Sequence, residues 1–379
     1  MSVARIPRSS PLLRALSVGK AAEMLGPLFQ ALPSVLKWAA ALVFVFNIRS
    51  WPLFWHFRIY STIWRYHRLL LSARLRLLGA SPKAKQSGLE KFYESRLHLG
   101  ESPFDRVYVW KEWAGPDDCD FNMHLSNSCY AKHLDVARFD AAIQMLQTGF
   151  FSGAWTALGA THYKFIKEIP MFAHYELRSS VAAWDNKWMY VVTRYVTHPN
   201  KKSKKAGSKH PGSGDSTPPL GPPFVPPIRT PATTHDTPSS LHPYDSALHD
   251  LLASLTPRTE PDGATLHCVV VSELCLKMGR ITIPPAVALA VEGYAGRAPS
   301  GEKYDATNNV HPHLEKIRAL KAKGNLRSAQ AFFRGSWKDL KDQDRWWMDV
   351  LGGDVEERRR RNLDLVSGVQ RGMEGAKYV

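Results

Sequence analysis

The chain is poor in cysteine, and the cysteines that it has are widely spaced. Its 379 residues contain four, none in a CxxC pair: Cys119, Cys129, Cys268 and Cys275. This pattern argues against a disulfide framework and against a zinc finger, and it favours a reducing compartment. Because no helix-turn-helix pattern is found either, the sequence predicts neither nucleic-acid binding nor a metal site.

Acidic residues are also scarce, since 34 Asp and Glu stand against 50 Lys and Arg, for a net charge of +16. The lysines of residues 201–205 lie among Gly, Ser and Pro, which is typical of a solvated loop. Five arginines instead follow an apolar, aromatic segment, where cationic side chains would meet lipid headgroups. They are Arg58, Arg65, Arg68, Arg74 and Arg76. This placement favours a membrane surface as the partner of the basic residues.

Long apolar runs are missing too. Within residues 32–60 the longest uncharged run, Trp38 to Ile48, has 11 residues, whereas a spanning helix needs about 20. Lys37 and Arg49 bracket this run and can snorkel, and Trp51 follows it. We expect the segment to associate with a membrane, either crossing it or lying in the interface. A buried amphipathic helix packed on the folded domain is the alternative.

The location of the protein follows from the same segments. If residues 32–60 cross the membrane, the arginines that follow place the rest of the chain in the cytosol. The first 22 residues are basic, rich in serine and free of acid, as in a mitochondrial presequence or a disordered basic tail. The sequence therefore predicts a membrane-associated protein, with the mitochondrion as the alternative location.

Composition divides the chain into six segments. In order, they are a basic tail (1–31), a membrane-associating helical segment (32–80), the first part of a folded domain (100–198), a Pro-, Ser- and Lys-rich insertion (199–263), the last strand of that domain (264–290) and a helical extension (291–379). The insertion is predicted to be disordered, with a short helix around 246–255. The basic stretch 356–362 of the extension is interpreted as a solvated helix face.

Periodicity predicts an α+β domain. A strand over 104–113 precedes a long helix that Asn127 or Ser128 can cap and that ends near Gly149. Four strands follow, at 157–166, 174–184, 187–198 and 265–279, and a DN turn makes the middle two a hairpin. The helix is apolar on more than one side, so we expect an antiparallel sheet to wrap around it.

The stretch DCDFNMHLSNSCY, residues 118–130, crowds polar side chains between the first strand and this helix. Its spacing resembles the hotdog-fold thioesterases, and most closely their membrane-anchored group typified by the sixth member of the thioesterase superfamily and its fungal relatives. The resemblance covers about 106–278 without the insertion, and Ser126 departs from the double Asn usual in the family. It rests on Asp118, Asp120, Asn122, His124, Asn127, Ser128, Tyr130, Asp135, Ala137 and Arg138.

The resemblance implies hydrolysis of an acyl thioester. Asp120 would be the catalytic carboxylate, acting through water or as nucleophile, while Asn122 and His124 orient water or polarise the carbonyl. The N-terminus of the helix would supply free N–H groups to the oxyanion. The residues expected to bind substrate are Asn127, Ser128, Cys129, Tyr130 and His162. No cofactor and no metal are implied.

Several of these residues have structural interpretations as well. We interpret Asp118 as a turn residue that bonds nearby backbone, and the same role is open to Asp120. His124 could fix the loop, Asn127 could cap the helix, and Cys129 could be a small packing residue. Asp135 and Arg138 fit an ion pair or a dimer contact.

The leading hypothesis is a homodimeric, membrane-associated hydrolase acting on acyl-CoA or a related acyl carrier. The alternative is a non-catalytic hotdog module that binds acyl chains or a partner protein at a membrane. A third hypothesis is a scaffold that acts mainly through the Pro-rich insertion. Loss of thioester turnover on Asp120→Asn would separate the first from the other two.

Overall fold

A computed structural model describes residues 34–198, 260–298 and 300–376. The predicted tail, most of the insertion and the helix expected at 246–255 lie outside these residues. Five strands form an antiparallel sheet in the order β1-β3-β4-β5-β2, and the short β6 pairs with β5. The strands are β1 (Tyr108–Trp113), β2 (Trp155–Phe165), β3 (His174–Trp184), β4 (Met189–Thr197), β5 (Thr265–Met278) and β6 (Ile281–Ile283).

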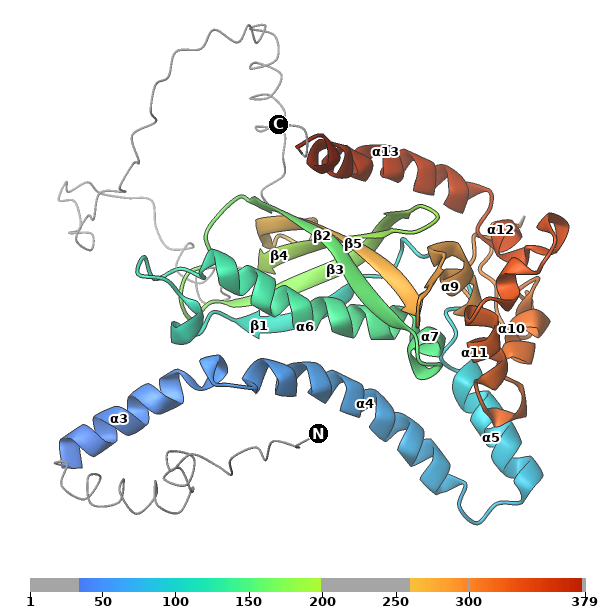
Figure 1. The fold of residues 1–379 in the computed structure, drawn as a ribbon, viewed down its shortest axis with the longest axis horizontal. Coiled ribbons are helices and arrows are strands. Elements are labelled where there is room, and N and C mark those ends of the chain that lie inside the picture. Colours follow the sequence, from blue (N-terminus) through green and yellow to red (C-terminus); the bar gives the residue numbers. More distant parts are fainter. Residues whose placement is uncertain (1–33, 199–259, 299, 377–379) are drawn as a thin grey trace, which may run out of the picture.

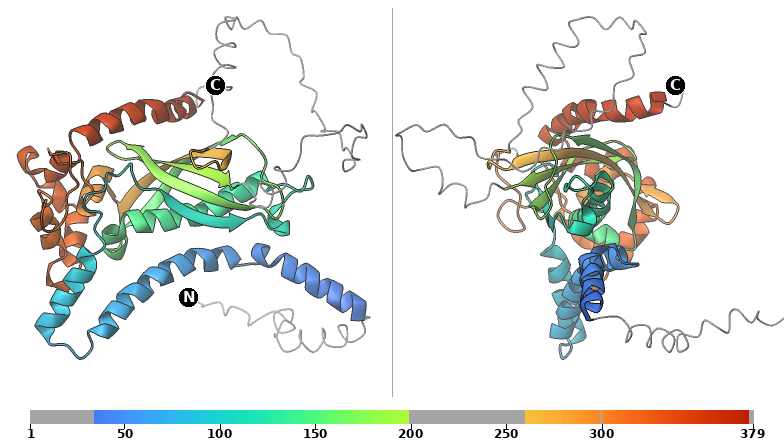
Figure 2. Two further views of the ribbon diagram at one scale, coloured as in Figure 1. Left: turned by 180° about the vertical axis from the view of Figure 1, so that it is seen from behind. Right: turned by 90° about the vertical axis from the view of Figure 1, so that its left-hand side faces the viewer.

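The sheet curves around the long helix α6 (Asn127–Met145), as the ribbon views show (Figures 1 and 2). Twelve of its residues are buried, and they lie on all sides of the helix. Contacts with the sheet and with the helix α4 (Phe54–Arg76) explain this, because a helix that is buried all round needs cover on all sides. The predicted α+β arrangement, an antiparallel sheet around a central helix, is confirmed.

The strands lie close to their predicted positions, with one clear difference. Residues 104–107 do not extend β1, because the chain turns where the N–H of Asp105 donates to Ser102 O at 3.1 Å. Phe104 instead packs its ring on Trp184, with centroids 5.2 Å apart. The predicted hairpin forms between β3 and β4, where Asp185 Oδ1 accepts the N–H groups of Lys187 and Trp188.

The segment before the domain is helical. It comprises α3 (Ser34–Phe46), the 3₁₀ turn η1 (Ile48–Ser50), α4 (Phe54–Arg76) and α5 (Pro82–Glu94). Figure 1 shows α3 and α4 as an arc along one side of the domain. None of the helices in the described ranges has both the length and the apolar character needed to cross a membrane.

The C-terminal extension covers one end of the domain with short helices, and its last helix, α13 (Asp354–Gly375), runs back along β3. The others are α9 (Pro285–Val291), α10 (Leu314–Leu320), α11 (Arg327–Phe333) and α12 (Trp346–Val350). The basic face of α13 was expected to be solvated, but part of it contacts the sheet. Arg359 donates to Trp184 O at 2.7 Å and Asn362 to Ala182 O at 2.8 Å, so these side chains tie α13 to the end of β3.

Candidate active site

The polar stretch forms a tight loop that ends on the N-terminus of α6. Cys119 and Leu125 form an antiparallel bridge, and inside it the N–H of Asp120 donates to His124 O at 2.9 Å. The N–H of Ser126 donates to Asp118 O at 3.0 Å, which closes the loop at its base. The loop 118–126, called the acidic loop below, therefore holds Asp120 a few residues from the helix start.

The three residues predicted to be catalytic all lie on the outer part of this loop. Asp120 is partly exposed, and its Oδ1 accepts the N–H of Asn122 at 2.9 Å. The side chain of Asn122 is exposed and that of His124 is partly exposed. The bond from Asp120 to the backbone two residues on is the turn role that the sequence left open. It engages one carboxylate oxygen, so the other can face a substrate.

The helix starts one residue earlier than predicted. Ser126 is its N-cap residue, and Asn127, expected to cap the helix, is already helical. The Ser126 side chain makes no capping bond; its hydroxyl lies 3.1 Å from that of Ser128. Among the described residues, no acceptor is paired with the N–H groups of Asn127 and Ser128. Two backbone donors at the positive end of the helix dipole thus remain available beside the acidic loop.

Asp118 ends the 3₁₀ turn η2 (Pro116–Asp118), but its side chain does not bond nearby backbone as the sequence interpretation expected. Its side chain is fully buried, with Oδ1 2.9 Å from Lys132 Nζ and Oδ2 3.2 Å from His133 Nε2. Oδ2 also lies 3.3 Å from a guanidinium nitrogen of Arg49. Burial alone would raise the pKa of Asp118, but His133, Lys132 and Arg49 together hold it well below its ordinary value. Asp118 is therefore a buried anion at the base of the acidic loop.

The charge cluster continues in two directions from Asp118. His133 Nδ1 is hydrogen-bonded to the hydroxyl of Tyr175 on β3. Arg49 also donates to Glu112 Oε1 at 2.6 Å, and Arg58 pairs with the other oxygen of that carboxylate. Burial opposes ionisation of Glu112, yet Arg58, His133 and Arg49 lower its pKa below the ordinary value. The cluster links the acidic loop to β1, β3, α6 and the segment before the domain.

Cys129 and Tyr130, predicted to bind substrate, are both buried in the core around the start of α6. The carbonyl of Tyr130 accepts the hydroxyl of Tyr195 at 2.7 Å. Burial and then the charge of Asp118 raise the pKa of the Cys129 thiol. The same two causes raise the pKa of Cys119 to about 11. Since the thiolate is the nucleophilic form, neither cysteine is poised for attack at neutral pH.

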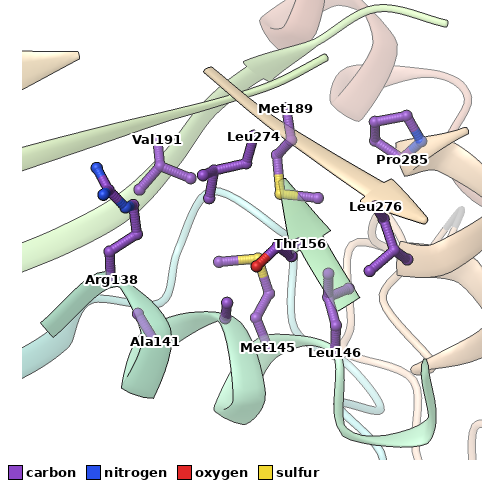
Figure 3. Close-up of a pocket in the computed structure, with 11 residues that line it drawn as sticks. Arg138, Ala141, Met145, Leu146, Thr156, Met189, Val191, Leu274, Leu276 and Pro285 are labelled. Carbon is purple, nitrogen blue, oxygen red and sulfur yellow. The ribbon is translucent and has the colours of Figure 1, made fainter. Parts of the chain in front are cut away.

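A small apolar cavity separates α6 from the sheet (Figure 3). It leaves about 10 Å³ for water, room for a single molecule. Its lining comprises Arg138, Ala141, Ala142, Met145, Leu146, Thr156, Met189, Val191, Leu274, Leu276 and Pro285. His162, expected to bind substrate, is exposed and not part of this lining. It lies on the other face of β2 from Thr161, which contacts Arg138.

Asp135 and Arg138 form the ion pair expected of them. Arg138 also donates to Thr161 Oγ1 at 3.3 Å and to Ser272 Oγ at 3.2 Å, so a charged group borders the mostly apolar cavity. Burial raises the pKa of Asp135, and Arg138 offsets part of that effect.

Sequence reasoning missed most of the charge cluster, namely Arg49, Glu112, Lys132, His133 and Tyr175. Arg49 was interpreted only as a flanking, snorkelling residue. No local pattern marks the others, because their partners lie far away along the chain. Within the described residues, no group of three or more His, Cys, Asp or Glu side chains could hold a metal ion.

The sequence that forms this site is similar to that of a known protein family. Residues 114–208 match the family described as the Thioesterase-like superfamily. The chain contains a thioesterase-like hotdog domain. The match spans the acidic loop, α6 and the strands β2 to β4, so the predicted resemblance is confirmed.

Two relatives and one solved structure illustrate the extent of the similarity. The chain is 25% identical to thioesterase lcsJ of Purpureocillium lilacinum over 195 residues, which is 43% of this chain and 60% of that protein. It is 29% identical to protein THEM6 of Danio rerio over 82 residues, 21% of this chain and 41% of that one. The chain thus spans at most about 60% of the length of these two relatives. The structure of 4-hydroxybenzoyl-CoA thioesterase from a Pseudomonas species aligns at 12% identity and a TM-score of 0.28, over 49% of this chain and 98% of that one.

The buried anion of the hotdog domain should be essential for stability. Asp118→Asn leaves Arg49 and Lys132 close together without their counter-charge, so we expect the free energy of unfolding to fall by about 3 kcal/mol or more. Urea denaturation followed by circular dichroism measures this. Asp344→Asn is the control, because Asp344 is exposed in the C-terminal extension, and it should cost about 0.5 kcal/mol or less. Equal losses in the two variants would contradict the special role of Asp118.

Low pH should remove the contribution of Asp118 to the free energy of unfolding. The pKa of Asp118 is lower in the folded protein than in the unfolded chain, so its contribution is complete above the unfolded value of about 4. It is lost as the pH falls from there through the folded pKa. Unfolding midpoints measured from pH 7 downward should therefore decline more steeply below pH 4 in the wild type than in Asp118→Asn. Parallel curves would exclude Asp118 as the titrating group.

Proposed function

We propose that the protein hydrolyses acyl thioesters, with acyl-CoA or a related acyl carrier as substrate. The observation that carries this proposal is the acidic loop, which holds Asp120 and leads directly into a helix N-terminus where two N–H groups have no acceptor among the described residues. Thioester hydrolysis needs a base or nucleophile at the carbonyl and donors directed at the developing oxyanion. The thioesterase name of the fungal relative supports this reaction class.

In this proposal Asp120 removes a proton from water, or attacks the carbonyl carbon directly. Asn122 and His124 lie on the same loop and orient the water or polarise the carbonyl. The N–H groups of Asn127 and Ser128 bind the oxyanion, and the C–S bond then breaks to release the thiol and the acid. No cofactor enters the reaction.

The acyl chain has an apolar space to enter between α6 and the sheet. The cavity there is closed to a chain at its present volume, so side chains have to move. Met145 and Met189 face each other across it (Figure 3), and methionine is the apolar side chain that adapts most readily. Asn127, Ser128, Cys129, Tyr130 and His162 remain the residues predicted to contact substrate.

Asp120→Asn tests the enzyme. Thiol release from a panel of acyl-CoA and acyl-pantetheine substrates should fall by about 100-fold or more, because the amide cannot act as a base or nucleophile. The control Asp344→Asn changes an exposed aspartate of the C-terminal extension and should keep full activity. Saturable acyl-CoA binding without turnover in the wild type would instead favour the non-catalytic acyl-binding module.

We also propose that α3 and α4 lie in the membrane interface. No residue of α3 is buried, and its apolar side chains are exposed. On α4 one face packs on the domain through Thr62, Tyr66 and Leu70. The opposite face carries a stripe at helical spacing, formed by the exposed Phe57, Tyr60, Trp64, Leu71 and Leu75.

The arginines of α4 also fall into two groups, those that pair with acids of the domain and those that are exposed. Arg58 and Arg65 were expected to meet lipid headgroups, but they pair with Glu112 and Asp140 of the domain, Arg58 largely buried and Arg65 half-exposed. Arg68, Arg74 and Arg76 are exposed, and the helix contains no acidic residue. An apolar stripe flanked by arginines alone fits the surface of an anionic bilayer.

Vesicle flotation tests the interface. The protein should float with vesicles of phosphatidylcholine and phosphatidylserine, and more weakly at high salt because the arginine contribution is screened. Trp64→Glu should weaken this binding by about tenfold or more, since it places a charge in the apolar stripe. The control Leu365→Glu changes an exposed residue of α13, on the opposite side of the domain. Equal loss in both variants, or no flotation of the wild type, would overturn the proposal.

We propose further that the protein is a homodimer joined through β2. This strand pairs only with β5 among the described residues, so its other edge offers unpaired backbone groups. It also exposes the large apolar side chains Trp155 and Leu158. These features support an interface at this edge of the sheet.

Light scattering after gel filtration tests the dimer. Leu158→Lys should shift the protein from dimer to monomer, because it places a charge in the proposed interface. Val109→Lys is the matched control, since Val109 is similarly exposed on the edge strand β1 at the other side of the sheet. Dissociation by the control alone would move the interface to β1, and a monomeric wild type would exclude it.

A further inference from the structure

Arg49 belongs to the segment before the hotdog domain, yet it is inserted into that domain. It lies in η1, between α3 and α4, and is 9% exposed. Its guanidinium donates to Trp113 O at 3.0 Å and to Glu112 Oε1 at 2.6 Å. It also lies 3.3 Å from Asp118 Oδ2 and 5.5 Å from the centre of the Trp113 ring. A guanidinium nitrogen also lies 3.4 Å from His133 Nε2, so one side chain from outside the domain makes five contacts within it.

These contacts fall on both ends of the segment that leads into the acidic loop. Glu112 and Trp113 are the last residues of β1, and Asp118 is the first residue of the loop. Arg49 therefore fixes where the chain leaves the sheet relative to where the loop begins. Because Asp118 O accepts the N–H of Ser126, the far end of the loop is tied to the same point.

Only a planar guanidinium group, with its two terminal nitrogens, can make these contacts to Trp113, Glu112 and Asp118 at once. Arginine offers several donors in one plane, and here one terminal nitrogen serves Trp113 O and Asp118 while the other serves Glu112. A lysine would keep the charge but could not hold three separated acceptors in fixed directions. Lys132 and His133 still contact Asp118 without Arg49, so the anion keeps part of its compensation.

We propose that Arg49 is a positioning residue for the reaction. It holds the acidic loop so that Asp120, two residues beyond Asp118, faces the free N–H groups of α6. Arg49 acts through Asp118 and touches no reacting group. The rate of thioester hydrolysis consequently depends on a segment that is not part of the hotdog domain. This inference rests on the proposed hydrolase activity.

The full-length variants Arg49→Gln and Arg49→Lys test the proposal. Displacing a catalytic group slightly lowers the rate of the chemical step, so kcat of Arg49→Gln should fall roughly ten- to hundredfold. KM should change by about twofold or less, because Arg49 does not line the acyl cavity. Arg49→Lys should recover only part of kcat. In Arg49→Ala, added guanidinium ion should raise the rate, an effect that a general loss of stability would not produce.

Arg58→Gln and Arg65→Gln are the matched controls. Each removes an arginine that joins the same helical segment to the domain, through Glu112 or Asp140, but neither contacts Asp118. Both should keep kcat within about twofold of the wild type. If they lose as much activity as Arg49→Gln, docking of the segment as a whole is what matters, and the specific role of Arg49 is overturned.

Hydrogen exchange separates failure of this inference from failure of the proposed function. Amides of residues 118–126 should exchange about tenfold faster or more in Arg49→Gln, because opening of the loop becomes easier. The two control variants should match the wild type. This measurement needs no activity, so unchanged exchange overturns the positioning role even if the wild type proves inactive. If turnover depends on Asp120 but not on Arg49, the hydrolase stands and the inference falls.

Discussion

The arrangement of this domain depends on the burial of one carboxylate. An isolated buried charge is costly, so Asp118 has to be surrounded by opposite charge and hydrogen-bond donors. Lys132 of α6 donates a hydrogen bond to one oxygen, while His133 of α6 and Arg49 of the preceding segment lie close to the other. His133 extends the network to Tyr175 on β3. Satisfying one anion therefore fixes the acidic loop against the central helix, the sheet and the N-terminal arc at once.

The same constraint explains where part of the positive charge goes. Arg49, Arg58 and Arg65 are compensated by acids of the domain, whereas Arg68, Arg74 and Arg76 are exposed on the far part of α4. Arg58 and Arg65 lie on the same side of α4 as the buried Thr62, Tyr66 and Leu70, so ion pairs and packing together turn this face toward the domain. The apolar stripe therefore faces away from the domain.

Strands and the central helix could be predicted because their signal is local. β3 was expected at 174–184 and is found there, since alternation of side chains is visible within a few residues. The charge cluster could not be predicted in this way. Arg49 and Glu112 are 63 residues apart, and Arg49 and His133 are 84 apart. Patterns describe neighbours on one element, whereas these pairs depend on how elements pack. The expectation that the Asp118 side chain bonds nearby backbone failed for this reason.

Two aspartates that look alike in sequence therefore have opposite environments. Asp118 has both oxygens in contact with cationic or imidazole groups, and its lowered pKa makes it a poor acceptor of a proton at neutral pH. Asp120 bonds one backbone N–H and is partly open to solvent. A carboxylate can serve as base only if its oxygens can reach the reacting group, and only Asp120 meets that condition. The environment, rather than the residue type, divides the structural role of Asp118 from the chemical role that we propose for Asp120.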